Sequence, residues 1–341
     1  MAGLVVERSQ VLWHRLRVNH LARRLPAGSF ASAAFAGLQD SAPRAALTSL
    51  HSRVEDVRTD AWEDPSLVQS WAPRGAVFVV PRSDLAVFAL GILPRDTELR
   101  QALEQLAEKA RESVQEPRVK VREEERLGPI APLILDRMRR QPICRLAHAL
   151  AGVQIRWDAR STQLIPGPAL EMDEEAARRE LARRFLRSLG PAAPARFMRW
   201  AAISQADART TFDALRDELV DVRWPGGSGV LLAEDAERLA RAEPVFAVSF
   251  VAFGGDPVLQ PGEELVAHGR SHRRAALPPW ACSGLVLLDG AVVAAWGRRQ
   301  RRVTILPLAP LGHERRHRIE AEALRMPSLG NEPDVLWRER R

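Results

Sequence analysis

The segment from Asp173 to Leu232 has an order of elements that few folds accommodate. "DEEAARRELARRFLRSLG" and "PAAPARFMRWAAI" predict two helices, and Ser204 is a suitable N-cap for a third, "QADARTTFDALRDEL". "LVDVRW", "PGGSG" and "VLLA" then predict a strand, a turn and a strand. Three helices closed by a β-hairpin predict a winged helix-turn-helix, in which the third helix reads DNA and the hairpin is the wing.

The same order appears near the N-terminus. A helix is predicted from Ser9 to about Leu21, followed by helices in "SFASAAFAGL" and "APRAALTSLHSRV". "LVQSW", "APRG" and "AVFVV" predict a hairpin, and further helices are expected from Ser83 and over residues 101–112. Residues 119–171 are weaker, with short helices at "PLILDRMRR" and "ICRLAHAL" and alternation in "VQIRW" and "TQLI", which together predict a shortened version of the unit.

The pattern changes to strands after Glu243. "GLVLL", "DG" and "AVVAAW" predict a hairpin with a type I′ turn, because Asp-Gly supplies the positive φ angles that this turn needs. "VTILPL" continues a meander, and the charged helix "ERRHRIEAEALRM" follows. The fold class is therefore predicted as α+β, with tandem winged helix-turn-helix units followed by a C-terminal antiparallel β-sheet or small barrel.

These patterns divide the chain into four predicted units. They are a first winged helix with additional helices over 1–118, a shortened second one over 119–171, a third over 172–243, and a C-terminal β domain with a final helix over 244–341.

The charge balance favours a polyanionic partner. Lys and Arg number 50 against 43 Asp and Glu, a net charge of +7, and Lys109 and Lys120 are the only lysines. Arginine binds phosphate and guanine edges with a planar fork, which points to nucleic acid. An alternative origin of the arginine excess is codon bias in a GC-rich genome.

The remaining composition suggests where the protein acts. Cys144 and Cys282 are isolated, which is typical of a reducing compartment, and we find no signal peptide or bilayer-length apolar run. We expect a cytoplasmic, nucleoid-associated protein that has no membrane association and needs no cofactor. The asymmetric tandem units predict a monomer on double-stranded DNA.

Several stretches in a fixed order carry a family resemblance. They include "GLQDS", "LVQSWAPRGAVFVVP", "RRFLRSLGPAAPARFMRWAAIS", "DPVL" and "GLVLLDGAVVAAW". From about Ser9 to Met326 the chain resembles the AlkZ-like winged-helix DNA glycosylases. The resemblance implies a monofunctional, metal-free DNA repair enzyme that hydrolyses the N-glycosidic bond of alkylated or crosslinked purines in duplex DNA.

The resemblance also implies a catalytic corner at Gln39, Asp40 and Ser41. The family carries Gln-x-Gln or Gln-x-Asp there, with an apolar middle residue. Gln39 matches the first position, Ser41 stands in place of the second, and Asp40 takes the apolar place. The Thr and His that often follow the family's Arg-Gly segment are replaced by Ala76 and Phe78. These departures favour an alternative function, a non-catalytic winged-helix DNA-binding or regulatory protein with a degenerate motif.

The chemistry of such a site can be argued from the residue types. An N7-alkylated purine leaves with its positive charge already in place, so the enzyme needs no strong general acid. Gln39 could orient water, Asp40 could act as a base or stabilise a cationic sugar, and Ser41 could hold water. If the corner turns as in the family, Asp40 faces away from Gln39 and Ser41.

A purely structural interpretation competes with the catalytic one. Ser41 would be the N-cap of a helix that begins at Ala42, Asp40 would interact with the helix dipole, and Gln39 would be a solvated turn residue.

The predicted DNA contacts lie beside the corner, on the third helix and wing of the clear unit, and in two basic loops. They are Arg74, Arg209, Thr210, Arg223, Trp224, Arg270, His272, Arg273, Arg274, Arg298, Arg299, Arg301 and Arg302. For each arginine the alternative is an ordinary solvated side chain.

Residues His313, Glu314 and His317 have the H-E-x-x-H spacing of zinc proteases. The adjacent arginines and the lack of a following third histidine argue for a solvated helix, so we expect no metal site.

Overall fold

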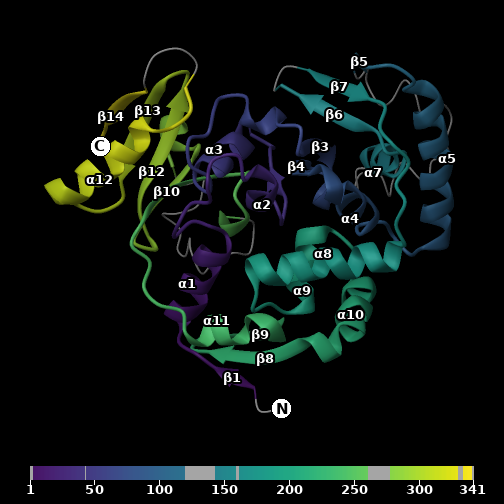
Figure 1. Cartoon of the computed structure of the whole chain (residues 1–341), viewed down its shortest axis with the longest axis horizontal. Helices are drawn as coiled ribbons and strands as arrows, with labels where there is room; N and C mark the ends of the chain where they lie inside the picture. The colour runs from purple at the N-terminus through teal and green to yellow at the C-terminus, as the bar shows by residue number, and fades with distance from the viewer. Residues whose placement is uncertain are drawn as a thin grey trace.

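The computed structural model describes residues 3–42, 44–119, 143–158, 161–259, 277–328 and 333–339. Their strands form three sheets, and Figure 1 shows these at the lower end, the upper right and the upper left of the molecule. The predicted α+β class is confirmed. The identity of the helical units as tandem winged helices remains a prediction.

The lower unit contains the helices and hairpin expected between Asp173 and Leu232. Its elements are α8 (Glu174–Leu189), α9 (Pro194–Ala201), α10 (Gln205–Ala214), β8 (Leu219–Trp224) and β9 (Gly227–Leu232). Ser204 caps α10 as expected, because its side chain accepts a hydrogen bond of 3.0 Å from the Asp207 amide. β1 (Leu4–Val5), which the sequence pattern did not predict, adds to this hairpin in parallel with β8.

The N-terminal half of the chain contains several helices and the sheet that has the most strands among the described residues. The helices are α1 (Arg8–Val18), α2 (Phe30–Ala33), α3 (Ala45–His51), α4 (Leu85–Leu90), α5 (Thr97–Ser113) and α7 (Ile143–Leu150). The sheet has the order β2-β4-β3-β6-β7-β5, from β2 (Leu38–Gln39), β3 (Leu67–Trp71), β4 (Val77–Pro81), β5 (Arg118–Val119), β6 (Gln154–Trp157) and β7 (Thr162–Ile165). The hairpins predicted for the first two units therefore join in one sheet, through Gln69 of β3 and Ile155 of β6. The predicted helix at "PLILDRMRR" lies outside the described residues.

The C-terminal sheet has the order β10-β11-β12-β13-β14 in the described residues. Its strands are β10 (Val248–Ala252), β11 (Gly284–Leu288), β12 (Ala291–Arg299), β13 (Arg302–Pro307) and β14 (Asp334–Trp337). The predicted Asp-Gly turn is confirmed, with φ of 53° at Asp289 and 82° at Gly290. Phe250, Trp296 and Ile319 are buried between this sheet and α12 (His313–Leu324), which follows the sheet as expected. The parallel strand β14 was not predicted.

Helix α3 joins the N-terminal half to the C-terminal sheet. Ala45 belongs to the core of that sheet, and the Ser52 hydroxyl donates 2.7 Å to the Phe250 carbonyl. Arg53 forms a fully buried, bidentate ion pair with Asp256, with N–O distances of 2.6 and 2.9 Å. Gly255 is required at this contact, because a Cβ there would lie 2.6 Å from the Ala45 Cβ. The loop after β10 is thus fixed against α3.

We expect Asp256→Ala to lower the free energy of unfolding by about 3–5 kcal/mol, because it leaves the Arg53 guanidinium buried without its partner. Urea unfolding measures this loss. Arg58→Ala is the matched control, since the Arg58–Asp60 pair is exposed and should contribute less than about 1 kcal/mol. Equal small losses in both variants would show that the buried pair does not hold the two parts together.

Candidate functional site

The predicted corner continues the short strand β2 between two neighbours. The amides of Gln39 and Ser41 each donate 3.1 Å to the loop after β10, to the carbonyls of Gly255 and Gly254. The Asp40 amide donates 2.8 Å in the opposite direction, to Val77 at the start of β4. Successive side chains of an extended segment point to opposite sides, so Gln39 and Ser41 share one side and Asp40 occupies the other.

The Gln39 side chain is held at both ends of its amide group. Its Nε2 donates 2.7 Å to the Ser41 hydroxyl, and its Oε1 accepts 2.5 Å from Arg74. Gln39 is only 9 % exposed, whereas Ser41 is exposed. These contacts differ from those of a solvated turn residue, because they fix the orientation of the amide at the edge of the accessible surface.

Arg74, a predicted DNA contact, is placed beside Gln39 by the tight turn between β3 and β4. Its φ of 63° lies in the left-handed region, and its second terminal nitrogen donates 2.6 Å to the Trp200 carbonyl at the end of α9. Burial lowers the pKa of Arg74 to about 10, so the guanidinium stays charged at neutral pH. It connects the corner to the lower helical unit.

Asp40 is fully buried on the opposite side of the corner. Its Oδ1 accepts 3.0 Å from the Ala46 amide in the first turn of α3, and its Oδ2 accepts 2.9 Å from the Gln69 side chain. Burial raises the pKa of Asp40 to about 6, opposed by these hydrogen bonds and by Arg44, which lies 3.9 Å away. The predicted contact of Asp40 with a helix N-terminus is confirmed. The alternative in which Ser41 caps that helix is wrong, because α3 begins at Ala45 and Asp40 reaches its free amide instead.

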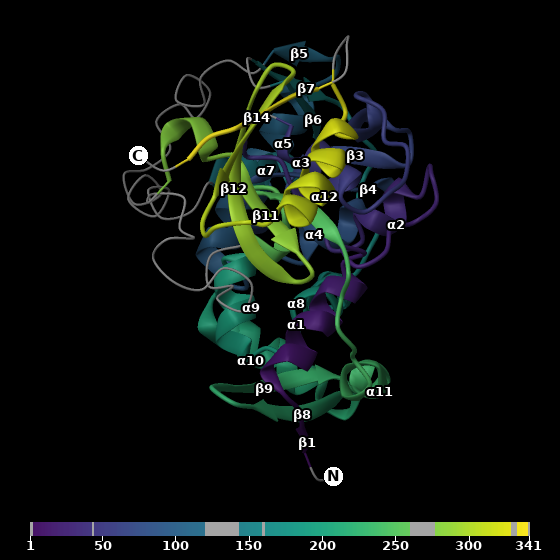
Figure 2. The same ribbon diagram turned by 90° about the vertical axis from the view of Figure 1, so that its left-hand side faces the viewer.

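The other predicted DNA contacts are spread over two regions. Arg209 and Thr210 on α10 and Arg223 on β8 are exposed, and Trp224 is half-buried. Figure 2 shows α10, β9 and β12 toward the same side of the molecule. Arg270, His272, Arg273 and Arg274 lie outside the described residues.

The second region is the turn between β12 and β13, where Arg299, Arg301 and Arg302 are exposed around a hollow of about 300 Å³. Arg302 pairs with Asp334 at 2.8 Å. Arg298 is half-buried and donates to the carbonyls of Gln300 and Pro327, so it braces the turn.

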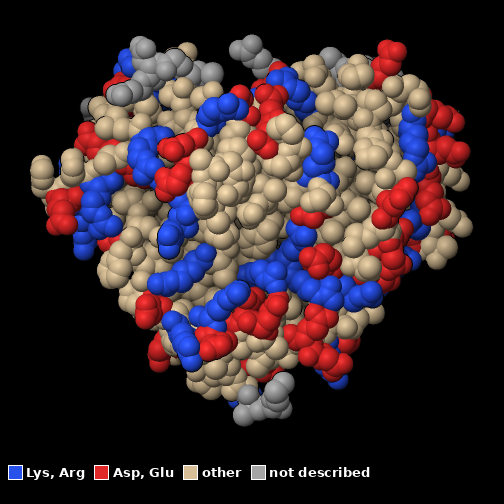
Figure 3. All heavy atoms as spheres, viewed as in Figure 1, with Lys and Arg blue, Asp and Glu red and all other residues tan. Residues whose placement is uncertain are grey.

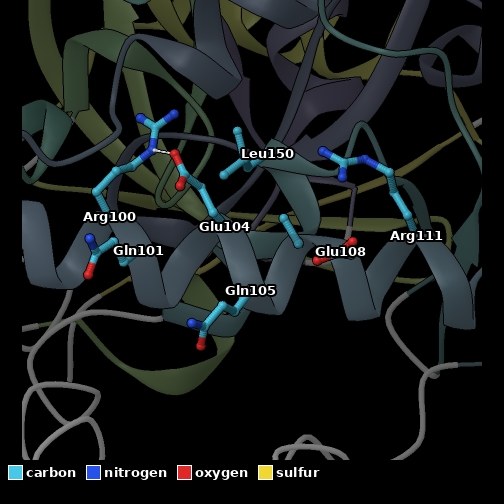
Figure 4. A pocket seen from close by; sticks show the side chains of 8 residues that line it. Arg100, Gln101, Glu104, Gln105, Glu108, Arg111 and Leu150 are labelled. Carbon is cyan, nitrogen blue, oxygen red and sulfur yellow. Dashed lines mark hydrogen bonds and ion pairs between the residues drawn. The ribbon is translucent and has the colours of Figure 1, made fainter.

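The larger hollows lie elsewhere and have mixed charge. One of about 810 Å³ runs along α5, where Figure 4 shows Arg100 bonded to Glu104 and further acidic and basic side chains along the helix. Another, of about 780 Å³, lies between α1 and α11 (Ala236–Ala240) and contains Arg17, Arg187 and Arg241. Figure 3, which has the same view as Figure 1, shows a band of basic side chains across the middle of the molecule, with acidic side chains beside it. Arg187, which lines the second hollow, pairs with Glu234, and this reduces the net charge of the hollow.

The H-E-x-x-H residues lie at the start of α12, where His313, Glu314 and His317 are all exposed. In the part of the chain that the structure describes, no group of three or more His, Cys, Asp or Glu side chains is arranged to hold a metal ion. Among the same residues, no helix combines the length and apolar character needed to cross a bilayer.

The sequence of the chain matches a known protein family. The model of the family described as "DNA glycosylase AlkZ-like" matches residues 33–328, which include the corner, α10 and the β12–β13 turn. The chain belongs to the AlkZ-like DNA glycosylase family. The structure of the Streptomyces sahachiroi DNA glycosylase AlkZ has the same fold, with a TM-score of 0.70 and 17 % identity over 98 % of this chain and 100 % of that one.

The chain is also similar in sequence to the interstrand DNA cross-link repair glycosylase of Streptomyces sahachiroi. It is 29 % identical over 147 residues, which are 41 % of this chain and 39 % of that protein. The matched segment thus spans about two fifths of the relative's length.

Sequence reasoning missed Gln69, the side chain that binds Asp40. A signal was present, because Gln69 and Ser70 are polar residues inside the otherwise apolar strand "LVQSW". A buried polar side chain in such a strand needs a partner. Nothing local indicated that the partner would be Asp40, 29 residues earlier.

The raised pKa of Asp40 has a consequence for stability. The folded protein binds this proton more tightly than the unfolded chain, in which the pKa has its ordinary value of 3.8. The free energy of unfolding should therefore fall by about 3 kcal/mol as pH rises from about 3 to above about 7. Asp40→Asn removes this dependence, so the wild type should lose stability relative to the variant over that range. Urea unfolding at several pH values tests this, with the exposed Asp60→Asn as control. Wild-type and Asp40→Asn curves that run parallel would contradict the prediction.

Proposed function

We propose that this chain is a monofunctional DNA glycosylase that hydrolyses the N-glycosidic bond of N7-alkylated or crosslinked purines. The observation that carries the proposal is the Gln39 amide, held between Arg74 and the exposed Ser41 hydroxyl. The family membership of the chain supports the same chemistry.

Gln39 and Ser41 together can hold the attacking water. An amide oxygen and a hydroxyl oxygen each have two acceptor sites. Arg74 uses one site on Gln39 Oε1, and the Gln39 amide uses one on Ser41 Oγ, so each oxygen keeps a site for a hydrogen of the same water. A water held in this way has its own lone pair directed at a reacting carbon beside the corner.

The reaction then balances without a strong acid. The water oxygen bonds to C1′ of the sugar as the bond from C1′ to N9 breaks, and the bonding electron pair neutralises the positive charge of the alkylated ring. One proton passes from the water to the exposed Ser41 hydroxyl, which releases its own proton to solvent, and the base leaves neutral. Ser41, although shorter than the family's Gln or Asp, keeps the acceptor that this step needs.

Asp40 has a different role in this proposal. Its carboxyl group is fully buried and accepts hydrogen bonds from α3 and Gln69, on the side away from Gln39 and Ser41. It therefore positions the corner without contacting DNA.

The DNA would lie as a duplex across α10, the β8–β9 hairpin and the basic turn after β12. The first two correspond to the recognition helix and wing of a winged helix. Their exposed Arg209 and Arg223 are free of the carboxylate contacts that Arg302 makes among the described residues. A single copy of the chain supplies both the binding surface and the corner, which supports a monomer.

A second candidate function is DNA binding without catalysis. Ala76 and Phe78 favour it, because Phe78 is buried in β4 opposite Gln39 and cannot replace a catalytic histidine. Saturable duplex binding with no base release would support this alternative.

The base-release experiment separates the two. We expect the wild type, at enzyme excess over duplex DNA containing N7-methylguanine, to produce sites that heating in alkali cleaves. Gln39→Ala should slow the release by roughly 100-fold, as for the loss of one oriented polar group in an active site. Gln101→Ala, on the exposed face of α5, is the control and should keep the wild-type rate. No cleavage by the wild type defeats the enzymatic proposal, and a full rate in Gln39→Ala defeats the role of Gln39.

Salt dependence distinguishes Arg74 from the predicted phosphate contacts. A plot of log K for DNA binding against log salt concentration has a negative slope. Arg209→Ala and Arg223→Ala should each make this slope less steep by about 1, because each variant loses one phosphate contact. Arg74→Ala should leave the slope unchanged and slow base release, since it frees the Gln39 amide. Binding titrations at several salt concentrations measure this. A less steep slope in Arg74→Ala would show instead that Arg74 contacts a phosphate of the DNA.

A further inference from the structure

Gln69 occupies an unusual position for a glutamine. It is 4 % exposed in the middle of β3, paired with Val79 of β4 on one side and Ile155 of β6 on the other. Leu67 and Trp71 of the same strand are buried among apolar side chains. A polar side chain is stable there only if its hydrogen bonds are made.

Both ends of the Gln69 amide are used. Its Nε2 donates 2.9 Å to Asp40 Oδ2, and its Oε1 accepts 2.7 Å from the Trp157 backbone amide at the end of β6. The two contacts fix which end of the amide carries oxygen, because a backbone amide only donates and the Asp40 carboxylate only accepts.

A second side chain closes the network. Arg44 donates 3.2 Å to the Trp157 carbonyl and lies 3.9 Å from Asp40, and its guanidinium stacks 3.9 Å from the centre of the Trp62 ring. The backbone of Trp157 is thus connected to the corner twice, through Gln69 and through Arg44. Asp40 continues the connection to α3 through the Ala46 amide.

We propose that Gln69 is a positioning residue for the corner, which orients Gln39 and Ser41 by holding Asp40 between them. The inference rests on the proposed function of Gln39 and Ser41. Asp40 is the residue between these two in an extended segment, so a rotation of its backbone turns both neighbouring side chains away from a common water.

The pair also accounts for the polar residue at this position. Asp40 accepts a hydrogen bond from Gln69, and each of the two side chains has a second partner in a backbone amide, that of Ala46 or Trp157. Removing Gln69 leaves Asp40 Oδ2 without its amide donor, and removing Asp40 leaves Gln69 Nε2 without its acceptor. Removing both leaves neither of these two atoms buried and unpaired, while the Ala46 and Trp157 amides lose their acceptors as they do in the single variants. The two residues should therefore be strongly coupled.

The experiment compares Gln69→Leu, Asp40→Leu and the double variant with the wild type, and Gln154→Leu on β6 is the matched control because its side chain binds Arg82 instead. The first measurement is hydrogen exchange of the backbone amides over residues 38–47. Gln69→Leu should speed this exchange at least 10-fold, and Gln154→Leu should not. The double variant should show less acceleration than the product of the two single effects.

The second measurement is single-turnover base release beside DNA affinity. Gln69→Leu should slow release at least 10-fold and change the dissociation constant for DNA less than twofold, which a general loss of structure does not do. The double variant should recover part of the rate. Failure of a single variant to fold, with a double variant that folds, shows the same coupling.

The two measurements separate this inference from the proposed function. If the wild type releases no base but the exchange responds as described, the glycosylase proposal fails and Gln69 still positions the corner. The inference is overturned by unchanged exchange over residues 38–47 in Gln69→Leu, by additive effects in the double variant or by a double variant that does not fold. Where the wild type releases base, an unchanged release rate in Gln69→Leu overturns it as well.

Discussion

The buried ion pair between Arg53 and Asp256 is the constraint on which the arrangement of the site depends. It fixes the loop after β10 against the end of α3, and the carbonyls of that loop receive the amides of Gln39 and Ser41. The corner therefore runs between a strand of the N-terminal sheet and a loop of the C-terminal sheet. Burying the two charges has a desolvation cost, which their paired hydrogen bonds of 2.6 and 2.9 Å offset.

The corner uses its two sides for different purposes. One side carries an amide and a hydroxyl that can hold water, and Arg74 connects it to α9. The other side is buried, where Asp40 satisfies a helix amide and Gln69. An aspartate in this sequence position suggests a catalytic carboxylate, but burial and hydrogen bonding suit it to holding the backbone. In the proposed reaction the water is held by two neutral groups, Gln39 and Ser41, which suffices when the leaving base is already cationic.

The sequence was a good guide wherever the signal was local. The periodicity of Glu174–Leu189, the Ser204 cap and the Asp289-Gly290 turn predicted elements that the structure contains. β1 and β14 were not predicted, because segments of two and four residues are too short to show the alternation of apolar and polar side chains. The strands with which they pair are also distant in the chain. The joining of two hairpins in one sheet depends on the contact between Gln69 and Ile155, which no local pattern specifies.

The candidate site shows the same limit. Its position at residues 39–41 was predicted, and so was the possibility that Asp40 faces away. Which group receives Asp40 was not predictable, because Gln69 and Ala46 reach it from two separate elements. The helix start was misjudged for a related reason. The chain bends at Ser41 and Ala42 and α3 begins only at Ala45, so Asp40 provides the acceptor that Ser41 was expected to provide.

In the proposed complex, Gln39 and Ser41 face the sugar of the damaged nucleotide. The most direct test is a crystal structure of the wild type with duplex DNA that contains N7-methylguanine on a 2′-fluorinated sugar, which slows the loss of the base. If Gln39 and Ser41 hold the attacking water, C1′ of that nucleotide will lie within reach of one water bound to Gln39 Oε1 and Ser41 Oγ. A complex in which the damaged nucleotide lies over another surface, with Gln39 and Ser41 facing only solvent, would contradict it.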